Sequence, residues 1–351
     1  MNLTVNTSKP YQILIERGCR NRVGEEAARI FPHGAKTVIV TDSNVGPIYA
    51  QGVASSLEAA GFQPAVFTFP AGEEHKRMDE ILHMYAAFSE HGLTRSDFVV
   101  ALGGGVTGDM AGFAAATYLR GIRFLQIPTS LLAQIDSSVG GKTGVDLPQG
   151  KNLVGAFHQP SLVLIDPDTL STLPDLFFSD GMGEAIKYGC IRDRALFDRI
   201  ADGNAKEEIE PIIFRCIDIK RQFVERDELD NGDRMRLNFG HTFGHALEKL
   251  HGYKDLTHGQ AVGIGMIMMS RCGEAVGLTE PSTADQIAAV LSKYGLPISD
   301  GMDPKRVEEV TRFDKKSRGD KIHLVLLKKI GESFLHTVTR QELSPFMEAL
   351  L

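Results

Sequence analysis

Three histidines and one glutamate have the residue types and spacing of a metal centre. His241 and His245 are four residues apart, so both imidazoles would project from one face of a helix. We expect His258 to lie in a short loop before an apolar helix over 261–276. Two histidines with Glu184 form a catalytic zinc set that leaves positions open for substrate oxygens. Spacing leaves open which histidine of the three is free for acid–base chemistry.

A glycine-rich segment predicts a dinucleotide site. Residues 103–108 read Gly-Gly-Gly-Val-Thr-Gly, between an expected strand at 98–102 and an expected helix at 109–116. There the backbone can approach a pyrophosphate at a helix start. The acidic residue expected about 20 residues downstream is missing, because 124–127 carries no carboxylate. Asp42, which ends an earlier expected strand, is the alternative ribose contact.

Basic residues in the same segments suggest that the ligand is an anion. The stretch 136–144 contains Gly-Gly-Lys-Thr but lacks the spacing of a phosphate loop, which disfavours a nucleoside triphosphatase. Within 183–187, a helix would place Glu184 and Lys187 on one side. Further candidate cations are Lys151, Lys220, Arg234 and the pair Lys315 and Lys316.

Two kinds of element must position these residues. Short β-branched runs at 37–41, 65–69, 98–102, 124–127 and 162–165 alternate with helical patterns such as 48–60 and 79–91. This alternation predicts a Rossmann-like α/β nucleotide-binding domain with a mostly parallel sheet over residues 1–175. Residues 176–351 predict a mostly α-helical domain, with strands returning only at 322–327 and 334–338.

Composition excludes several classes of function. The 351 residues carry a formal net charge of -7, which argues against an extended nucleic-acid surface. The four cysteines have no paired spacing, so neither a disulfide framework nor a thiolate zinc site is expected. No secretory signal or membrane span is visible, and we expect a cytoplasmic protein without a membrane partner.

Several of these segments together resemble the 3-dehydroquinate synthase family of sugar-phosphate cyclases. The resemblance rests on 103–109, on 136–142, on Lys151-Asn152, on 183–187 and on the run Asn-Phe-Gly-His-Thr-Phe-Gly-His at 238–245. These segments occur in the family's order over nearly the whole chain. The resemblance implies a homodimeric enzyme that uses NAD and Zn²⁺ or Co²⁺ to convert a phosphorylated sugar acid into a carbocycle.

The resemblance also implies residue roles. The metal ligands would be Glu184, His241 and His258, and the catalytic residues would be His245, Lys142 and Asp230. NAD contacts would be Asp42, Asn44, Glu73, Lys76, Gly104, Gly105, Val106, Asp109, Thr129, Ser130, Lys151 and Thr172. Substrate contacts would be Arg120, Asp136, Lys142, Asn152, Lys187, Lys220, Arg234, Asn238 and Lys316.

Three positions depart from the family pattern. Gln260 and Asp230 each stand where the family has glutamate, and 234–237 reads Arg-Met-Arg-Leu instead of Arg-Asn-Leu-Leu. None of them removes an implied ligand. The alternatives are another sugar-phosphate cyclase, a metal-dependent alcohol dehydrogenase of similar build, and a metal-stabilised binding protein without chemistry.

Overall fold

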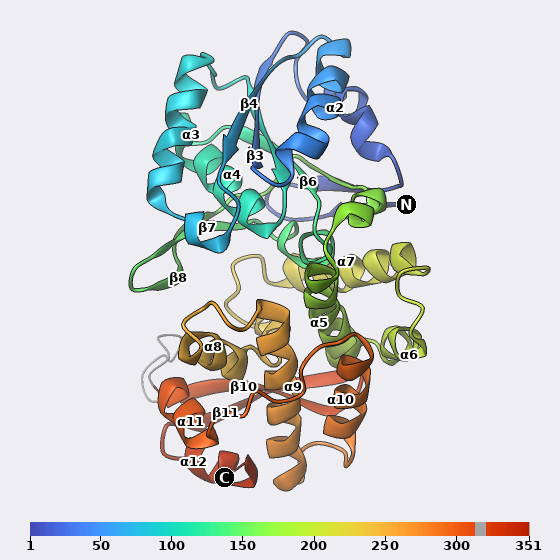
Figure 1. Cartoon of the computed structure of the whole chain (residues 1–351), viewed down its shortest axis with the longest axis vertical. Helices are drawn as coiled ribbons and strands as arrows, with labels where there is room; N and C mark the ends of the chain where they lie inside the picture. Colours follow the sequence, from blue (N-terminus) through green and yellow to red (C-terminus); the bar gives the residue numbers. More distant parts are fainter. Residues whose placement is uncertain (313–320, 351) are drawn as a thin grey trace. The chain divides into compact units, whose positions relative to one another are not determined.

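The computed structural model describes residues 1–312 and 321–350, and its first compact unit comprises residues 1–174 and 220–229. Seven strands form the main sheet of this unit in the order β1-β2-β9-β6-β5-β3-β4. Figure 1 labels β3, β4 and β6 of this sheet. Their bounds are β1 Asn2–Val5, β2 Tyr11–Ile15, β3 Lys36–Asp42, β4 Gln63–Phe69, β5 Phe98–Gly103, β6 Arg123–Pro128 and β9 Leu162–Ile165. Every neighbouring pair is parallel except β1 and β2.

Helices cover both faces of this sheet, so its central strands are buried on both sides. The helices are α1 Val23–Ala28, α2 Gly46–Ala59, α3 Met78–Glu90 and α4 Gly105–Thr117. Along β5, Phe98 and Val100 share one apolar core with α1 and α2. Val99 and Ala101 share the other core with α3 and α4. This alternation explains why the central strands are continuous apolar runs, and it confirms the expected α/β domain.

The first unit also contains elements that we did not predict. The antiparallel pair β1 and β2 extends the sheet at one edge. A separate hairpin joins β7 Lys142–Leu147 to β8 Gly150–Phe157. Short helical turns are η1 Cys19–Arg22, η2 Glu73–His75, η3 Tyr118–Arg120, η4 Ala133–Ser137 and η5 Pro167–Thr172. Lys142 therefore begins a strand rather than a helix, unlike the lysine of a phosphate loop.

The second compact unit comprises residues 175–219 and 230–351, and its described part is mostly helical, as predicted. Its longer helices are α5 Asp175–Arg192, α6 Arg194–Asp202, residues 209–219 of α7 Ile209–Arg226, α8 His241–Leu250, α9 His258–Ala275, α10 Thr283–Lys293 and α11 Pro304–Arg312. A two-stranded antiparallel sheet pairs β10 Lys321–Lys329 with β11 Glu332–Thr339. Shorter helices are η6 Asp233–Asn238, α12 Leu343–Met347 and η7 Glu348–Leu350. No helix in the described part of the chain has the length and apolar character to cross a membrane.

Candidate metal centre and nucleotide site

Three helices of the second unit each contribute one predicted metal ligand. Glu184 lies in the middle of α5, His241 is the first residue of α8, and His258 is the first residue of α9. The expectation of a loop at His258 was wrong. The helix begins there because the backbone N–H of Thr257 donates a hydrogen bond to Gln260 Oε1 at 3.0 Å. Gln260 thus supplies the acceptor oxygen at the helix start, as a glutamate at this position would.

Glycines set the distance between these helices. A Cβ atom on Gly259 of α9 would lie 2.0 Å from the backbone oxygen of Asp180 in α5. A Cβ atom on Gly265 of α9 would lie 2.1 Å from the backbone oxygen of Gly240, which precedes α8. Gly240 also has φ 80°, a conformation that favours glycine. Any larger residue would move the helices that carry the three ligands apart.

The ligand atoms lie at separations that suit one metal ion. Glu184 Oε1 lies 3.5 Å from His241 Nε2 and 3.7 Å from His258 Nε2. All three ligand atoms lie within 4.8 Å of one another. Tetrahedral zinc holds its ligand atoms ~2 Å from the ion and therefore ~3.3 Å apart. Small side-chain movements would bring this set to that geometry.

The surroundings of Glu184 also fit a cation. Its side chain is fully buried, and within residues 1–312 and 321–350 its Oε1 accepts no hydrogen bond. Lys187, one helical turn further along α5, is equally buried and forms an ion pair with Glu184 Oε2. Buried carboxylates are normally hydrogen-bonded or bound to metal, so Oε1 is suited to an ion. The predicted alignment of Glu184 and Lys187 is confirmed.

The surroundings shift the pKa values of the two histidine ligands in opposite directions. Burial and the positive charge of Lys187 hold the pKa of His241 well below its ordinary value, so its imidazole is neutral at neutral pH. Burial also lowers the pKa of His258, but Glu248 and Glu184 outweigh it and raise this pKa to about 9. Only a neutral imidazole can bind a metal, so the ion competes with a proton at His258.

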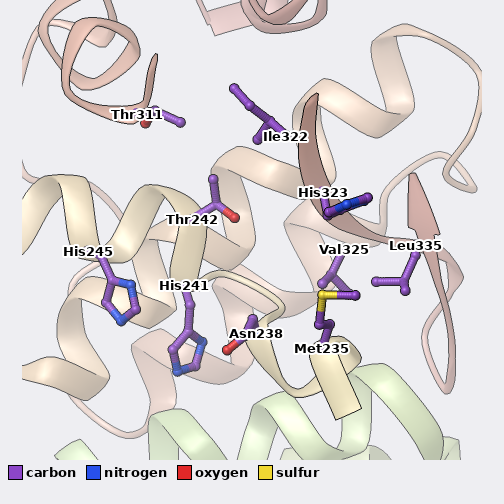
Figure 2. A pocket seen from close by; sticks show the side chains of 10 residues that line it. All are labelled: Met235, Asn238, His241, Thr242, His245, Thr311, Ile322, His323, Val325 and Leu335. Carbon is purple, nitrogen blue, oxygen red and sulfur yellow. The ribbon is translucent and has the colours of Figure 1, made fainter. Parts of the chain in front are cut away.

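His245 lies beside the two histidine ligands. Its ring centroid is 5.3 Å from that of His241 and 6.2 Å from that of His258. Figure 2 shows His241 and His245 projecting from the same side of α8, as their spacing predicted. Both line a pocket of the second unit. Its other lining residues are Met235, Asn238, Thr242, Thr311, Ile322, His323, Val325 and Leu335.

Two other predicted residues of the second unit, Arg234 and Asp230, differ in burial. Arg234 is 2% exposed and belongs to η6, the short helix that ends at Asn238. Asp230 has φ 58°, which a residue other than glycine keeps only where its surroundings hold it. Lys315 and Lys316 lie outside the described residues.

In the first unit, predicted nucleotide contacts cluster where β3 and β5 end. Asp42 Oδ1 accepts hydrogen bonds from the backbone N–H groups of Asn44 and Val45, and its Oδ2 lies 3.3 Å from the hydroxyl of Thr107. Helix α4 begins at Gly105, earlier than the predicted residue 109. The backbone N–H groups of its first turn are therefore positioned for an anion.

Further predicted nucleotide contacts extend this cluster. A Cβ atom on Gly104 would lie 3.4 Å from Ser130 Oγ. The backbone N–H of Thr129 donates to the carbonyl of Gly103, at the end of β5. Thr172 lies within 2.7 Å of the hydroxyl of Tyr49 in α2, a residue that we did not predict.

Lys76 links two other predicted site residues. Its Nζ donates to Asp109 Oδ2 and to Asn152 Oδ1, both at 2.7 Å, and it is 4% exposed. Burial lowers the pKa of Lys76, but Asp109 and Glu73 outweigh it and hold the pKa above its ordinary value. Burial raises the pKa of Asp109, and Lys76 opposes this rise. Glu73 in turn lies 3.9 Å from Lys151 Nζ.

Lys220 is a second buried basic residue, and it forms an ion pair with Asp136. Lys220 Nζ donates to both the backbone carbonyl and the carboxylate of Asp136, each at 2.6 Å. Arg120 has φ 70° and ends η3 on the surface, and Lys142 begins β7 as an exposed residue.

Two acidic residues of the metal centre were not predicted. Asp180 lies one helical turn before Glu184, and its Oδ1 accepts a hydrogen bond from the backbone N–H of Gly259 at 2.5 Å. Glu248 lies 3.5 Å from His258 Nδ1. The spacing of His241, His245 and Glu248 was a usable signal, because residues at i, i+4 and i+7 share one helix face.

Comparisons with known proteins give matches in both units of the chain. A family model described as 3-dehydroquinate synthase N-terminal matches residues 66–180, and one described as 3-dehydroquinate synthase C-terminal matches residues 181–317. The 3-dehydroquinate synthase of Clostridium acetobutylicum is 46% identical over 345 residues, which cover 97% of each chain.

Solved structures of similar fold include two sugar-phosphate cyclases. The 2-epi-5-epi-valiolone synthase from Streptomyces hygroscopicus subsp. jinggangensis 5008, with NAD+ and Zn²⁺ bound, has a TM-score of 0.86 and 26% identity, covering 97% of this chain and 96% of that one. The 2-deoxy-scyllo-inosose synthase complexed with carbaglucose-6-phosphate, NAD+ and Co²⁺ has a TM-score of 0.87, 24% identity and full coverage of both chains. At this identity, the second match shows the fold alone.

Proposed function

The chain belongs to the 3-dehydroquinate synthase family, and we propose that its residues divide the work of that reaction between a metal centre and two groups of basic residues. The activity is conversion of 3-deoxy-D-arabino-heptulosonate 7-phosphate to 3-dehydroquinate and phosphate. It combines transient oxidation, β-elimination, reduction and an intramolecular aldol closure. The observation that carries the residue assignment is the buried cluster of Glu184, His241 and His258.

The cofactors are NAD and a divalent metal ion, Zn²⁺ or Co²⁺. When bound, NAD accepts and returns a hydride, and the metal ion polarises the substrate hydroxyl oxygens that it binds. Glu184, His241 and His258 would hold the metal in the domain formed by residues 176–351. Residues 1–175 would bind NAD, with Asp42 at the ribose and the start of α4 at the pyrophosphate. Asn44, Glu73, Lys76, Gly104, Gly105, Val106, Asp109, Thr129, Ser130, Lys151 and Thr172 would be the further NAD contacts.

His245 would accept the proton of the substrate hydroxyl. Its ring lies beside both histidine ligands, and an imidazole can take up and return a proton near neutral pH. Asp230 and Lys142 would assist this proton transfer. Full turnover by His245→Ala would contradict the assignment.

The basic residues would hold the phosphate and carboxylate groups of the substrate in place. Lys187 and Arg234, with Asn238, would act in the second unit. Arg120, Lys142 and Lys220 would act in the first, with Asp136 and Asn152 contacting uncharged or hydroxyl groups of the substrate. Lys316 completes the set. Fixed cations align a flexible substrate for elimination and ring closure, which is a positioning contribution. We further propose that the protein is cytoplasmic. We also propose that it forms a homodimer, which analytical ultracentrifugation would test.

Phosphate release tests the proposed reaction. We expect release from 3-deoxy-D-arabino-heptulosonate 7-phosphate, its loss in chelator, and its return when Zn²⁺ or Co²⁺ is added back. Glucose 6-phosphate and sedoheptulose 7-phosphate, which lack the carboxylate, serve as controls and should release little phosphate. Equal release from all three sugars, or unchanged activity in metal-free protein, would contradict the proposal.

Variants test the metal ligands separately from turnover. Glu184→Gln preserves the side-chain shape but removes the charge, so we expect loss of bound metal while the apo protein keeps its fold. His241→Ala should have the same effect. Metal content after dialysis, with circular dichroism as the fold control, is the measurement.

A further inference from the structure

Glu248 is a buried carboxylate that the reaction described above does not use. It lies on the same face of α8 as His241 and His245, and its side chain is 2% exposed. A buried carboxylate is costly unless a cation or hydrogen-bond donors face it. Its Oε1 lies 3.5 Å from Nδ1 of His258, the ring nitrogen that points away from Glu184.

The two nitrogens of His258 therefore face two different carboxylates. Nε2 lies 3.7 Å from Glu184 Oε1, within the candidate metal site, and Nδ1 faces Glu248. A carboxylate next to one ring nitrogen holds the proton there, which leaves the other nitrogen free to bind a metal. It also fixes the plane of the ring.

The backbone next to His258 is held by a hydrogen bond to α5. Asp180 accepts the backbone N–H of Gly259 at 2.5 Å, so α5 fixes the first turn of α9 where His258 lies. The backbone of His258 is thus held by α5, and its side chain faces α8 through Glu248. The backbone contact and the Glu248 carboxylate together favour one orientation of the imidazole.

From this geometry, we propose that Glu248 is a positioning residue that orients His258 through Nδ1 and thereby sets the affinity and geometry of the metal centre. The inference rests on the proposed metal centre of Glu184, His241 and His258. It assigns Glu248 no direct contact with the metal or the substrate.

A competing arrangement uses the same atoms. His245, Glu248 and His258 also offer ligand atoms within 4.8 Å of one another, as a second metal site would. Such a site needs Nδ1 of His258 as a ligand, whereas the orienting role needs a proton on it. The number of ions bound per chain separates the two arrangements.

Metal binding by variants of Glu248 tests the proposal. We expect the parent protein to bind one Co²⁺ per chain. Glu248→Ala should weaken Co²⁺ binding roughly 10- to 100-fold in chelator competition and alter the visible absorption spectrum of the Co²⁺ complex. Glu248→Gln, which keeps the volume and an acceptor oxygen, should have an intermediate effect. It also keeps the test valid if the alanine variant does not fold.

Glu308→Gln is the matched control. Glu308 is a buried glutamate of the same unit that accepts a hydrogen bond from Ser344, so its variant should leave the Co²⁺ spectrum unchanged. Parent-like affinity and spectrum in both Glu248 variants would overturn the orienting role, as would two ions bound to the parent. If the parent binds no metal, the proposed metal centre itself fails, which is a distinguishable result.

Discussion

At the residue scale, we expect the ion pair of Lys76 and Asp109 to contribute to the unfolding free energy of the protein. Lys76 donates to Asp109 and Asn152, and the lysine is almost fully buried. Lys76→Met leaves Asp109, whose side chain is 22% exposed, without its cation, so we expect the protein to lose about 1–3 kcal/mol of unfolding free energy. Urea unfolding followed by circular dichroism is the measurement.

The double variant separates the charge from the packing. Adding Asp109→Asn to Lys76→Met removes the uncompensated charge, so part of the lost stability should return. If the two substitutions are simply additive, the pair does not interact as its geometry indicates. NAD affinity measured on the same variants would show whether the pair also shapes the nucleotide site.

The cysteines behave as core residues. Cys19, Cys190, Cys216 and Cys272 are all buried and unpaired with one another, in line with the absence of a disulfide framework in the sequence. Burial raises the pKa of Cys19 and of Cys272 to about 12, so their thiolate forms are rare at neutral pH. We expect Ellman's reagent to label the folded protein only slowly and to label four thiols in denaturant. Fast labelling of the folded protein would contradict this burial.

At the scale of elements, the close approach of α5 and α9 is the feature on which the metal centre depends. The Gly259→Ala variant would place a methyl group 2.0 Å from the backbone oxygen of Asp180, which cannot move aside as a flexible side chain could. We expect a loss of about 1–3 kcal/mol in stability and weaker Co²⁺ binding. Thermal unfolding and chelator competition are the measurements.

Gly52→Ala is the matched control for this substitution. Gly52 lies within α2, and a Cβ atom there would meet nothing within 4 Å. Replacing it should stabilise the protein by about 0.4–1 kcal/mol, because alanine restricts the unfolded chain. Opposite signs for the two variants would identify helix packing as the cause, whereas equal losses would point to a general intolerance of alanine.

Elements with a strong periodic pattern were predictable from the sequence. The run 98–102 is apolar throughout because helices cover both sides of β5, and the α8 face with His241 and His245 follows from helical spacing. The hairpin β7–β8 was not predictable, because β8 is half exposed and its glycines resemble a loop. Its position depends on tertiary contacts such as the bond from the Asp146 N–H to the Lys76 carbonyl.

The candidate site likewise contains some residues whose contacts were predictable from the sequence and others whose contacts were not. Glu184 and Lys187 have a spacing that predicts their alignment, and their pairing is confirmed. Helical spacing places Glu248 on the same face as His241 and His245, but its contact with His258, like the contact of Asp180 with Gly259, depends on which helices pack together. The start of α9 at His258 follows a capping box of Thr257 and Gln260, which is a sequence signal that our prediction of a loop missed.

At the scale of the whole molecule, the first unit includes a segment that is distant in sequence. Residues 220–229 join it, and Glu225 and Glu228 accept hydrogen bonds from the backbone N–H groups of Asn6 and Ser8, both at 2.8 Å. The same segment supplies Lys220 to Asp136. The sequence does not indicate that residues 220–229 belong to the first unit, because polar residues at a helix end are usually exposed to solvent.

The fate of the nicotinamide cofactor distinguishes a cyclase from a dehydrogenase of similar fold. A dehydrogenase consumes one NAD per substrate, whereas this reaction returns the hydride within each turnover. We therefore expect phosphate release to exceed the amount of NAD supplied many times over, with no steady rise in NADH absorbance. In a single turnover, His245→Ala should slow phosphate release and the transient formation of NADH together, because the proton must leave the hydroxyl as the hydride is transferred. Accumulation of NADH in step with phosphate would contradict the cyclase mechanism and favour a net oxidation.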